Sequence, residues 1–171
     1  MFFIHLFARP VANAPHRATI QKDMQIISSA FANNATLPKK YTCQGEGVNP
    51  PLSFTDVPVN TKSLALIVDD PDAPSGVFTH WVLFNIPPNV DSIAENNYPV
   101  GAVMSVTSAG KPEYVAACPP SGTGVHHYRF KLYALDTVIV LTPNVEVTDL
   151  ENAMQGHIVA SSQLVGLYPE K

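Results

Sequence analysis

Proline is the residue that most limits how this chain can fold. The sequence contains 16 prolines among 171 residues, well above the usual share of about 5%. Proline lacks a backbone N–H and its ring clashes inside a helix, so it is kept out of helix interiors and of central strands. The prolines therefore predict many rigid loops between strands, and they exclude an all-helical fold.

Length and charge narrow the class of protein. A chain of 171 residues with 46% hydrophobic residues is long enough for one domain around a single core. The net charge is −4, with 10 Lys and Arg against 14 Asp and Glu. This balance leaves no basic stripe for a phosphate backbone, so we expect no nucleic-acid partner. The sequence has no run of about 18 apolar residues, so we expect no membrane span.

The first residues are interpreted as a separate segment. The apolar run Phe2–Ala8 and the small-x-small triplet Ala12-Asn13-Ala14 are similar to a secretory signal, but no Lys or Arg precedes the run and His5 interrupts it. We therefore expect an N-terminal extension of unclear role over residues 1–23 and a domain over residues 24–171. The expected location is the cytoplasm. The alternative is a periplasmic or secreted protein, if the segment is a cleaved signal.

Two cysteines, Cys43 and Cys118, are too few for a disulfide framework. One bond between them is feasible only if their Cα atoms lie within about 7 Å, which the sequence does not show. The interpretation we favour is two free thiols that are buried or partly buried. A single disulfide is the alternative.

Hydrophobic periodicity predicts an all-β core. Ser63–Asp69 and Phe78–Ile86 are almost continuously apolar over the length of a strand, which is typical of strands buried on both faces. A third strand, His127–Leu135, alternates between apolar and polar positions. Its apolar face carries Tyr128, Phe130, Leu132 and Ala134, and shorter strands are expected at Met24–Phe31, Leu52–Phe54 and Ala102–Thr107.

One helix is expected near the C-terminus. Thr148 and Glu151 have the spacing of a capping box, with Thr148 as the N-cap. Apolar residues then recur at helical spacing from Leu150 to Val165. Gly166 and Pro169 would end the helix. The predicted fold class is therefore an all-β, sandwich-like core with a C-terminal helix.

Polar residues gather in loops beside the apolar strands. Asp70 and Asp72 bracket Pro71, His80 interrupts a buried strand, and His126 shares a strand face with Tyr128. An Asp beside each His would raise its pKa and keep the ring protonated. Imidazolium, tyrosine hydroxyl and backbone N–H groups in the loop Ser121–Val125 could then hold a phosphate-sized anion. We interpret His127, on the opposite strand face, as a surface residue.

Two other chemistries stay open from the residues alone. Two histidines and two aspartates could ligate a metal, although they lack a ligand spacing such as His-Glu-x-x-His. A hydrolase could use His126 as its base with Ser121 or Cys118 as the nucleophile, although the Gly-x-Ser-x-Gly elbow is missing. The hydrolase is the alternative to a non-enzymatic binding protein.

Several motifs in order resemble the phosphatidylethanolamine-binding protein family, above all its bacterial Raf-kinase-inhibitor-like branch. They are Asp70-Pro71-Asp72-Ala73-Pro74, Thr79-His80-Trp81-Val82 and Pro119–Tyr128, with Tyr41–Gly45 and Met154–Ile158 as further matches. The resemblance covers roughly residues 24–168. It implies a β-sandwich-like fold with a small cavity for phosphate, a carboxylate or a phosphoethanolamine head group.

The resemblance also implies roles for individual residues. Asp70, Asp72, His80, His126 and Tyr128 match the cavity residues, and Pro74 and Pro119 frame the mouth. The family is known for no cofactor and no metal. It implies a non-enzymatic protein, with a kinase or protease as the type of protein partner and a homodimer as its assembly. An inhibitor or scaffold that uses its surface instead of the cavity is a further alternative.

This chain departs from the family pattern near the cavity. His127 stands where the family has Arg in its Gly-x-His-Arg-Tyr segment. Val115-Ala116-Ala117 replaces the usual Gly-Gly-Pro before Cys118. The segment Met104–Tyr114 also lacks the usual Asn-Asp-x-Gly pattern, so we expect a different cavity rim.

Overall fold

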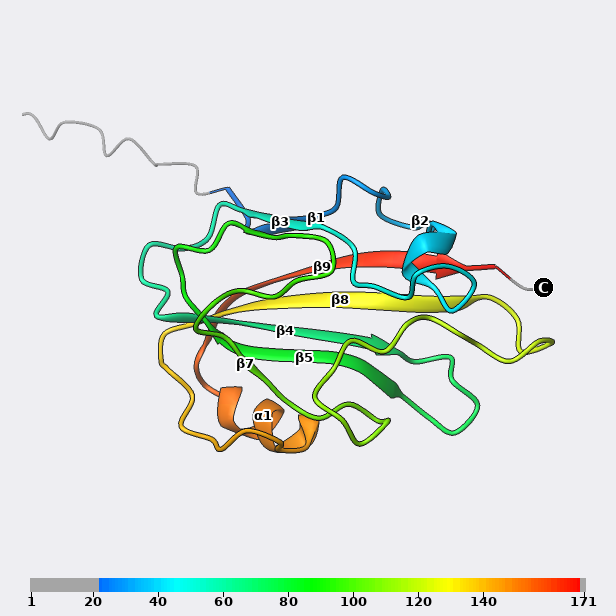
Figure 1. The fold of residues 1–171 in the computed structure, drawn as a ribbon. Helices are drawn as coiled ribbons and strands as arrows, with labels where there is room; N and C mark the ends of the chain where they lie inside the picture. Colours follow the sequence, from blue (N-terminus) through cyan, green and yellow to red (C-terminus); the bar gives the residue numbers. More distant parts are fainter. Residues whose placement is uncertain (1–21, 170–171) are drawn as a thin grey trace, which may run out of the picture.

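Two β-sheets packed face to face form the body of the protein in the computed structural model, which describes residues 22–169 (Figure 1). The smaller sheet contains β1 (Gln25–Ile27), β3 (Leu52–Thr55) and β6 (Ser92–Ile93). The larger sheet has the order β2-β9-β8-β4-β5-β7. Its strands are β2 (Ala35–Thr36), β4 (Ser63–Asp70), β5 (Phe78–Ile86), β7 (Val103–Met104), β8 (His126–Leu135) and β9 (Ile158–Tyr168). The predicted all-β class is confirmed.

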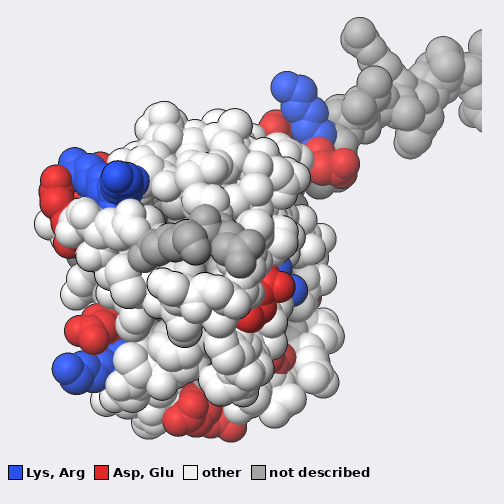
Figure 2. All heavy atoms as spheres, turned by 90° about the vertical axis from the view of Figure 1, so that its right-hand side faces the viewer, with Lys and Arg blue, Asp and Glu red and all other residues white. Residues whose placement is uncertain are grey.

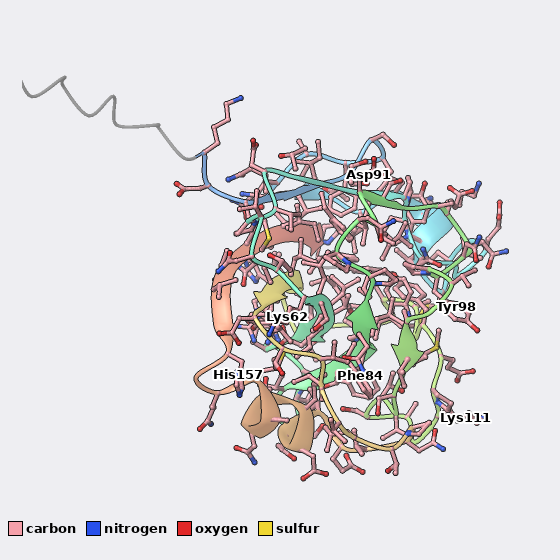
Figure 3. All side chains as sticks on the ribbon, turned by 90° about the vertical axis from the view of Figure 1, so that its left-hand side faces the viewer. Lys62, Phe84, Asp91, Tyr98, Lys111 and His157 are labelled. Atoms are coloured by element: carbon pink, nitrogen blue, oxygen red, sulfur yellow. A yellow bond between two sulfur atoms is a disulfide. The ribbon has the colours of Figure 1, made fainter. Side chains whose placement is uncertain are left out.

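Strand β4 is covered on both faces, which explains its unbroken apolar sequence. All 8 of its residues are buried. Leu64, Leu66 and Val68 face the smaller sheet. Ala65 and Ile67 belong to a second core beneath the larger sheet, which they share with Phe84 and with Leu150 of the helix α1 (Val147–Met154; Figures 1 and 3). Burying such a side chain contributes about 1.5–3 kcal/mol, so two cores hold the central strands in place.

Strand β8 shows the predicted alternation. Tyr128, Phe130, Leu132 and Ala134 are buried between the sheets. On the other face, Arg129 and Lys131 form ion pairs with the buried Asp69 of β4, at 2.7 Å each. The ring contact between Phe31 and Phe130 closes the core towards the N-terminal segment. One face of β8 is therefore buried and most of the other is partly exposed, as the alternation predicts.

The predicted C-terminal helix is confirmed, but its predicted length and N-cap are wrong. Only Val147–Met154 is helical, the N-cap is Glu146, and no side chain caps that end. Gly156, with φ of 78°, stops the helix, because this left-handed conformation suits glycine. From Ile158 to Tyr168 the chain is strand β9, paired antiparallel with β8. The other helical element of residues 22–169 is a short 3-10 helix, η1 (Lys39–Tyr41).

The two cysteines form a disulfide, so the favoured prediction of two free thiols is wrong. Cys43 and Cys118 have Cα atoms 5.3 Å apart, although 75 residues separate them in sequence. A parallel bridge between Thr42 and Ala117 brings their two segments together. The Cys43 N–H donates to the Ala117 carbonyl at 3.0 Å, which fixes the two cysteines side by side.

Residues 1–21 lie outside the described part of the chain, and with them most of the predicted N-terminal extension. Between residues 22 and 169, no helix is both long enough and apolar enough to cross a membrane.

Candidate functional site

A cavity of about 260 Å³ lies at the end of the larger sheet where β4 ends and β8 begins. The loops 71–77 and 119–125 and the segment 115–118 form its walls. Of the residues predicted for the site, it is lined by Asp70, Pro74, His80, Pro119, His126 and Tyr128. Three loops and three strands therefore bring these residues together, although they span more than 50 positions of the sequence.

Asp70 and His126 form a buried pair behind the cavity. The Asp70 Oδ2 atom lies 2.6 Å from His126 Nδ1, and the side chains are 3% and 0% exposed. Asp70 Oδ1 accepts the N–H of Asp72 at 2.9 Å, which turns the loop after β4. Both carboxylate oxygens are thus engaged inside the protein.

The second nitrogen of His126 is occupied as well. Its Nε2 atom lies 2.8 Å from the hydroxyl of Thr123. That hydroxyl donates its single proton to the Pro120 carbonyl at 2.7 Å, so it accepts from His126 Nε2. Nε2 therefore carries a proton. One further proton lies between His126 Nδ1 and Asp70 Oδ2, so the pair has no net charge, whichever of the two atoms holds it. Sequence reasoning missed Thr123 as the partner of His126.

His80 presents a different environment. Its Nδ1–H donates a hydrogen bond to the carbonyl of Val115 at 2.8 Å, because a carbonyl oxygen can only accept. The ring is held between Phe78, at 4.7 Å between centroids, and Tyr128, at 5.0 Å. Burial lowers the pKa of His80 below its ordinary value, and the nearby Asp70 does not compensate. The expectation that a carboxylate keeps this ring protonated is therefore wrong for His80.

Tyr128 contributes a neutral hydroxyl to the cavity. The residue is 2% exposed. Burial raises the pKa of its phenol strongly, and the nearby Asp70 raises it further. A backbone hydrogen bond with Cys118 opposes this shift and places the phenol oxygen against the disulfide segment. Tyr128 therefore stays protonated and can donate to a ligand.

Asp72 does not line the cavity, unlike the other predicted site residues. Its Oδ2 accepts the backbone N–H of His127 at 2.9 Å and lies 2.8 Å from His127 Nδ1. Partial burial would raise the pKa of Asp72, but the two hydrogen bonds from His127 lower it overall. The His127 side chain is 48% exposed, which confirms its interpretation as a surface residue. The pair fastens the loop after β4 to the start of β8.

Neither predicted nucleophile of the hydrolase alternative is placed for attack. The sulfur of Cys118 is bonded to Cys43, so it offers no thiolate. The hydroxyl that contacts His126 belongs to Thr123 and not to Ser121. Within residues 22–169, no three His, Cys, Asp or Glu side chains are grouped so that they could hold a metal ion.

A larger hollow of about 700 Å³ lies beside the buried Trp81 and the partly buried Tyr114, whose rings meet edge to face at 5.5 Å. Asparagines, tyrosines and Glu113 supply its polar groups, and no His, Lys or Arg of residues 22–169 lines it. Its neutral donors therefore have no titratable or cationic nitrogen beside them, and the Glu113 carboxylate opposes an anion. The smaller cavity, with its two histidines, is the candidate site.

The end of the molecule that carries the loops of the cavity faces the viewer in Figure 2. Lys and Arg side chains appear at the margins of this face, and the uncovered middle is largely uncharged. The cavity lining agrees, since none of its residues in the described part of the chain is Lys or Arg. A ligand at this site meets histidine, tyrosine and backbone groups instead of a permanent cation.

Comparison with known proteins gives consistent results. The family model described as phosphatidylethanolamine-binding protein matches residues 27–169. A UPF0098 protein of Methanothermobacter thermautotrophicus is 48% identical over 85% of this chain and 98% of its own length. A phosphatidylethanolamine-binding protein homologue of Chlamydia trachomatis has a solved structure with a TM-score of 0.82 and 43% identity, covering 87% of this chain and 99% of that one.

A more distant solved structure has the same fold. YbcL of Escherichia coli, described as a member of the mammalian family, is 29% identical with a TM-score of 0.82. It covers 88% of this chain and 100% of its own. The region 27–169 that the family model matches includes every residue that lines the cavity.

Proposed function

The chain belongs to the phosphatidylethanolamine-binding protein family, and from this premise we propose that it is a non-enzymatic binding protein. Its ligand is a small anion, either a phosphate-bearing group such as the phosphoethanolamine head group or a carboxylate. The ligand occupies the cavity between His80, Tyr128 and the loops that carry Pro74 and Pro119. A volume of about 260 Å³ suits a head group better than a larger molecule.

One observation carries this proposal. His80 and Tyr128, whose ring centroids lie 5.0 Å apart, line the cavity together, beside the buried pair Asp70 and His126, whose polar atoms bond to each other and to the protein. Convergent polar groups in a mostly apolar cavity are typical of ligand sites. The matching family model is described as a binding protein, which supports this proposal. The name UPF0098 of the relatives states no enzymatic activity.

Hydrolysis is the weaker candidate. It requires a free nucleophile beside His126, and Thr123 donates its proton to the Pro120 carbonyl instead of to the histidine. Turnover of a broad panel of esters and phosphoesters that is lost in Thr123→Val would favour the hydrolase after all.

The test is a titration of the protein with O-phosphoethanolamine, followed by NMR of the histidine rings. We expect saturable shifts of His80 with ligand, and a loss of at least tenfold in affinity in His80→Asn and Tyr128→Phe. His157→Asn is the matched control, because His157 is exposed and pairs with Asp136 at the end of the molecule shown in Figure 3. No saturation of the wild-type protein at millimolar ligand would refute the proposal.

We also propose an oxidising compartment, in place of the cytoplasmic location expected from the sequence. Cys43 and Cys118 are both exposed, and a solvent-accessible disulfide is lost where thiol buffers are reducing. Rapid alkylation of source cells should leave both cysteines unmodified until a reductant is added. Alkylation of both without a reductant would contradict this location.

A further inference from the structure

The charges around the cavity leave an anion without a fixed counter-charge. No Lys or Arg of residues 22–169 lines the site. His126 and Asp70 share the proton between Nδ1 and Oδ2, so this pair adds no net charge. Further back, Asp69 is balanced by Arg129 and Lys131. An anion that entered with its full charge would be desolvated without compensation, which is costly.

His80 is placed to supply that compensation. Its Nδ1 proton is committed to the Val115 carbonyl, so in the neutral ring Nε2 is an unprotonated acceptor. No residue between 22 and 169 forms a hydrogen bond with Nε2. The fully buried side-chain atoms of the described chain without a hydrogen-bond partner include Thr61 Oγ1 and Trp81 Nε1, but His80 Nε2 is not one of them. His80 Nε2 is therefore accessible, and it opens into the cavity that the ring lines.

The other groups facing His80 do not take up a proton in its place. Both nitrogens of His126 have partners, Thr123 and Asp70. Both oxygens of Asp70 accept hydrogen bonds. Tyr128, on β8, is protonated already, because burial raises the pKa of its phenol. From β5 itself, Phe78 offers only its ring.

We propose that the cavity binds its anion together with one proton, which is shared between the ligand and His80 Nε2. This inference rests on the proposed function and specifies the ligand class. The bound unit is either a singly charged phosphate monoester whose O–H donates to Nε2, or a protonated carboxylic acid. A sulfate ester, which brings no proton, binds only when His80 takes one from water.

The proton produces a pH dependence with a definite sign. A phosphate monoester loses its second proton with a pKa of about 6. Above that pH the protonated complex needs one proton from solution, so the Kd rises about tenfold per pH unit. Below it the ligand carries the proton itself and the Kd levels off. The sulfate ester gains affinity down to the pKa of His80, which burial places below the ordinary value of 6.5.

The experiment compares O-phosphoethanolamine with its sulfate counterpart, O-sulfoethanolamine, on the wild-type chain. Calorimetry at pH 7.5 in two buffers of different ionisation heat should report about one proton taken up per ligand for both. At pH 5.5 the uptake should fall towards zero for the phosphate ester, whereas for the sulfate ester it should fall only to the extent that His80 is already protonated in the free protein. Nitrogen-15 NMR of the histidine rings should show His80 Nε2 becoming protonated at saturation with the sulfate ester, and accepting a hydrogen bond from the phosphate ester.

Two controls assign the proton to His80. His157→Asn should leave the proton count unchanged, since that exposed histidine lies outside the cavity. His80→Asn keeps a donor for the Val115 carbonyl but cannot titrate, and any remaining binding should lose its dependence on pH between 7 and 8.

The outcomes separate this inference from the proposed function. Saturable binding with no proton uptake, or with protonation of a different histidine, overturns the inference and leaves the binding function standing. The absence of saturable binding by either ester in the wild-type chain overturns both.

Discussion

Removing the disulfide should be the most destabilising change that leaves the native contacts almost intact. The bond joins Cys43 and Cys118 across a sequence separation of 75. In the chain-entropy treatment, a closed loop of that length removes unfolded-state entropy equivalent to about 4.5 kcal/mol at 25 °C. We therefore expect Cys43→Ser/Cys118→Ser to lower the free energy of unfolding by about 4 kcal/mol.

The double substitution should change few contacts in the folded state. Both cysteines are exposed, so replacing sulfur by oxygen removes little packing. The Thr42–Ala117 bridge and the hydrogen bond from the Cys43 N–H to the Ala117 carbonyl, at 3.0 Å, hold the two segments without the bond. The loss should therefore arise mainly in the unfolded ensemble, and the cavity wall at Cys118 should persist.

The assay is urea unfolding followed by the fluorescence of Trp81, the one tryptophan of the chain, which is 1% exposed. A domain of this size loses about 2–4 °C of Tm per kcal/mol, so the Tm should fall by roughly 8–16 °C. Adding a thiol reductant to the wild type should reproduce the loss and should not affect the double variant. A loss below about 1 kcal/mol in the double variant would refute the loop-entropy reasoning.

Three further changes test other parts of the structure. Asp69→Asn leaves Arg129 without its buried carboxylate and should lower the free energy of urea unfolding by about 2 kcal/mol, less than for a fully buried pair, because the Arg129 side chain is 31% exposed. An unchanged free energy of unfolding would show that water already compensates the charge of Arg129. Gly166→Ala places a Cβ inside the Leu37 side chain and should cost about 1–3 kcal/mol, whereas an unchanged midpoint would show that Leu37 moves aside. Burial lowers the pKa of His80 in the folded protein below the ordinary value of 6.5, so the unfolded chain binds more protons as the pH falls through that value. The free energy of unfolding should therefore fall from pH 7.5 to pH 5. The fall should be smaller in His80→Asn, and an identical fall would contradict the lowered pKa.

The central strands could be predicted from sequence because their pattern is purely hydrophobic. The predicted Ser63–Asp69 and Phe78–Ile86 match β4 and β5 to within one residue, and His127–Leu135 differs from β8 only by His126. Each of these strands is buried on one face or both, so the core itself fixes their side-chain period.

Strand β9 could not be predicted because its inward residues are small. Three of the inward positions of β9 carry Ala160, Ser162 and Gly166. Large apolar residues at these positions would have produced the alternation that identifies a strand. They are small because other segments pack there. The Ile26 N–H donates to Ser162 Oγ at 3.2 Å, and Leu37 sits directly against Gly166. The larger residues that remain happen to repeat at helical spacing, which led to the wrong length of the helix.

The residues around the site could be predicted, but not their partners. Motifs placed His80, His126 and Tyr128 near Asp70, and the structure brings these four to one cavity. The proximity of Thr123 to His126 depends on how a glycine-flanked turn folds over the end of β8, which no residue pattern reveals. Likewise, the loop after β4 turns Asp72 outward to His127, although the sequence treats its two aspartates alike.

The buried pair of Asp70 and His126 is better explained by the cavity than by stability. Removing two charges from water costs about as much as their attraction returns, so such a pair is weak evidence for a stabilising role. Its effect on the site is larger, because the pair has no net charge and both nitrogens of His126 are engaged inside the protein. An arginine in place of His126 would offer an anion a permanent cation at every pH. Among residues 22–169, His80 is the titratable nitrogen that opens into the cavity, so the proposed site retains its ligand where a proton is available and releases it where none is.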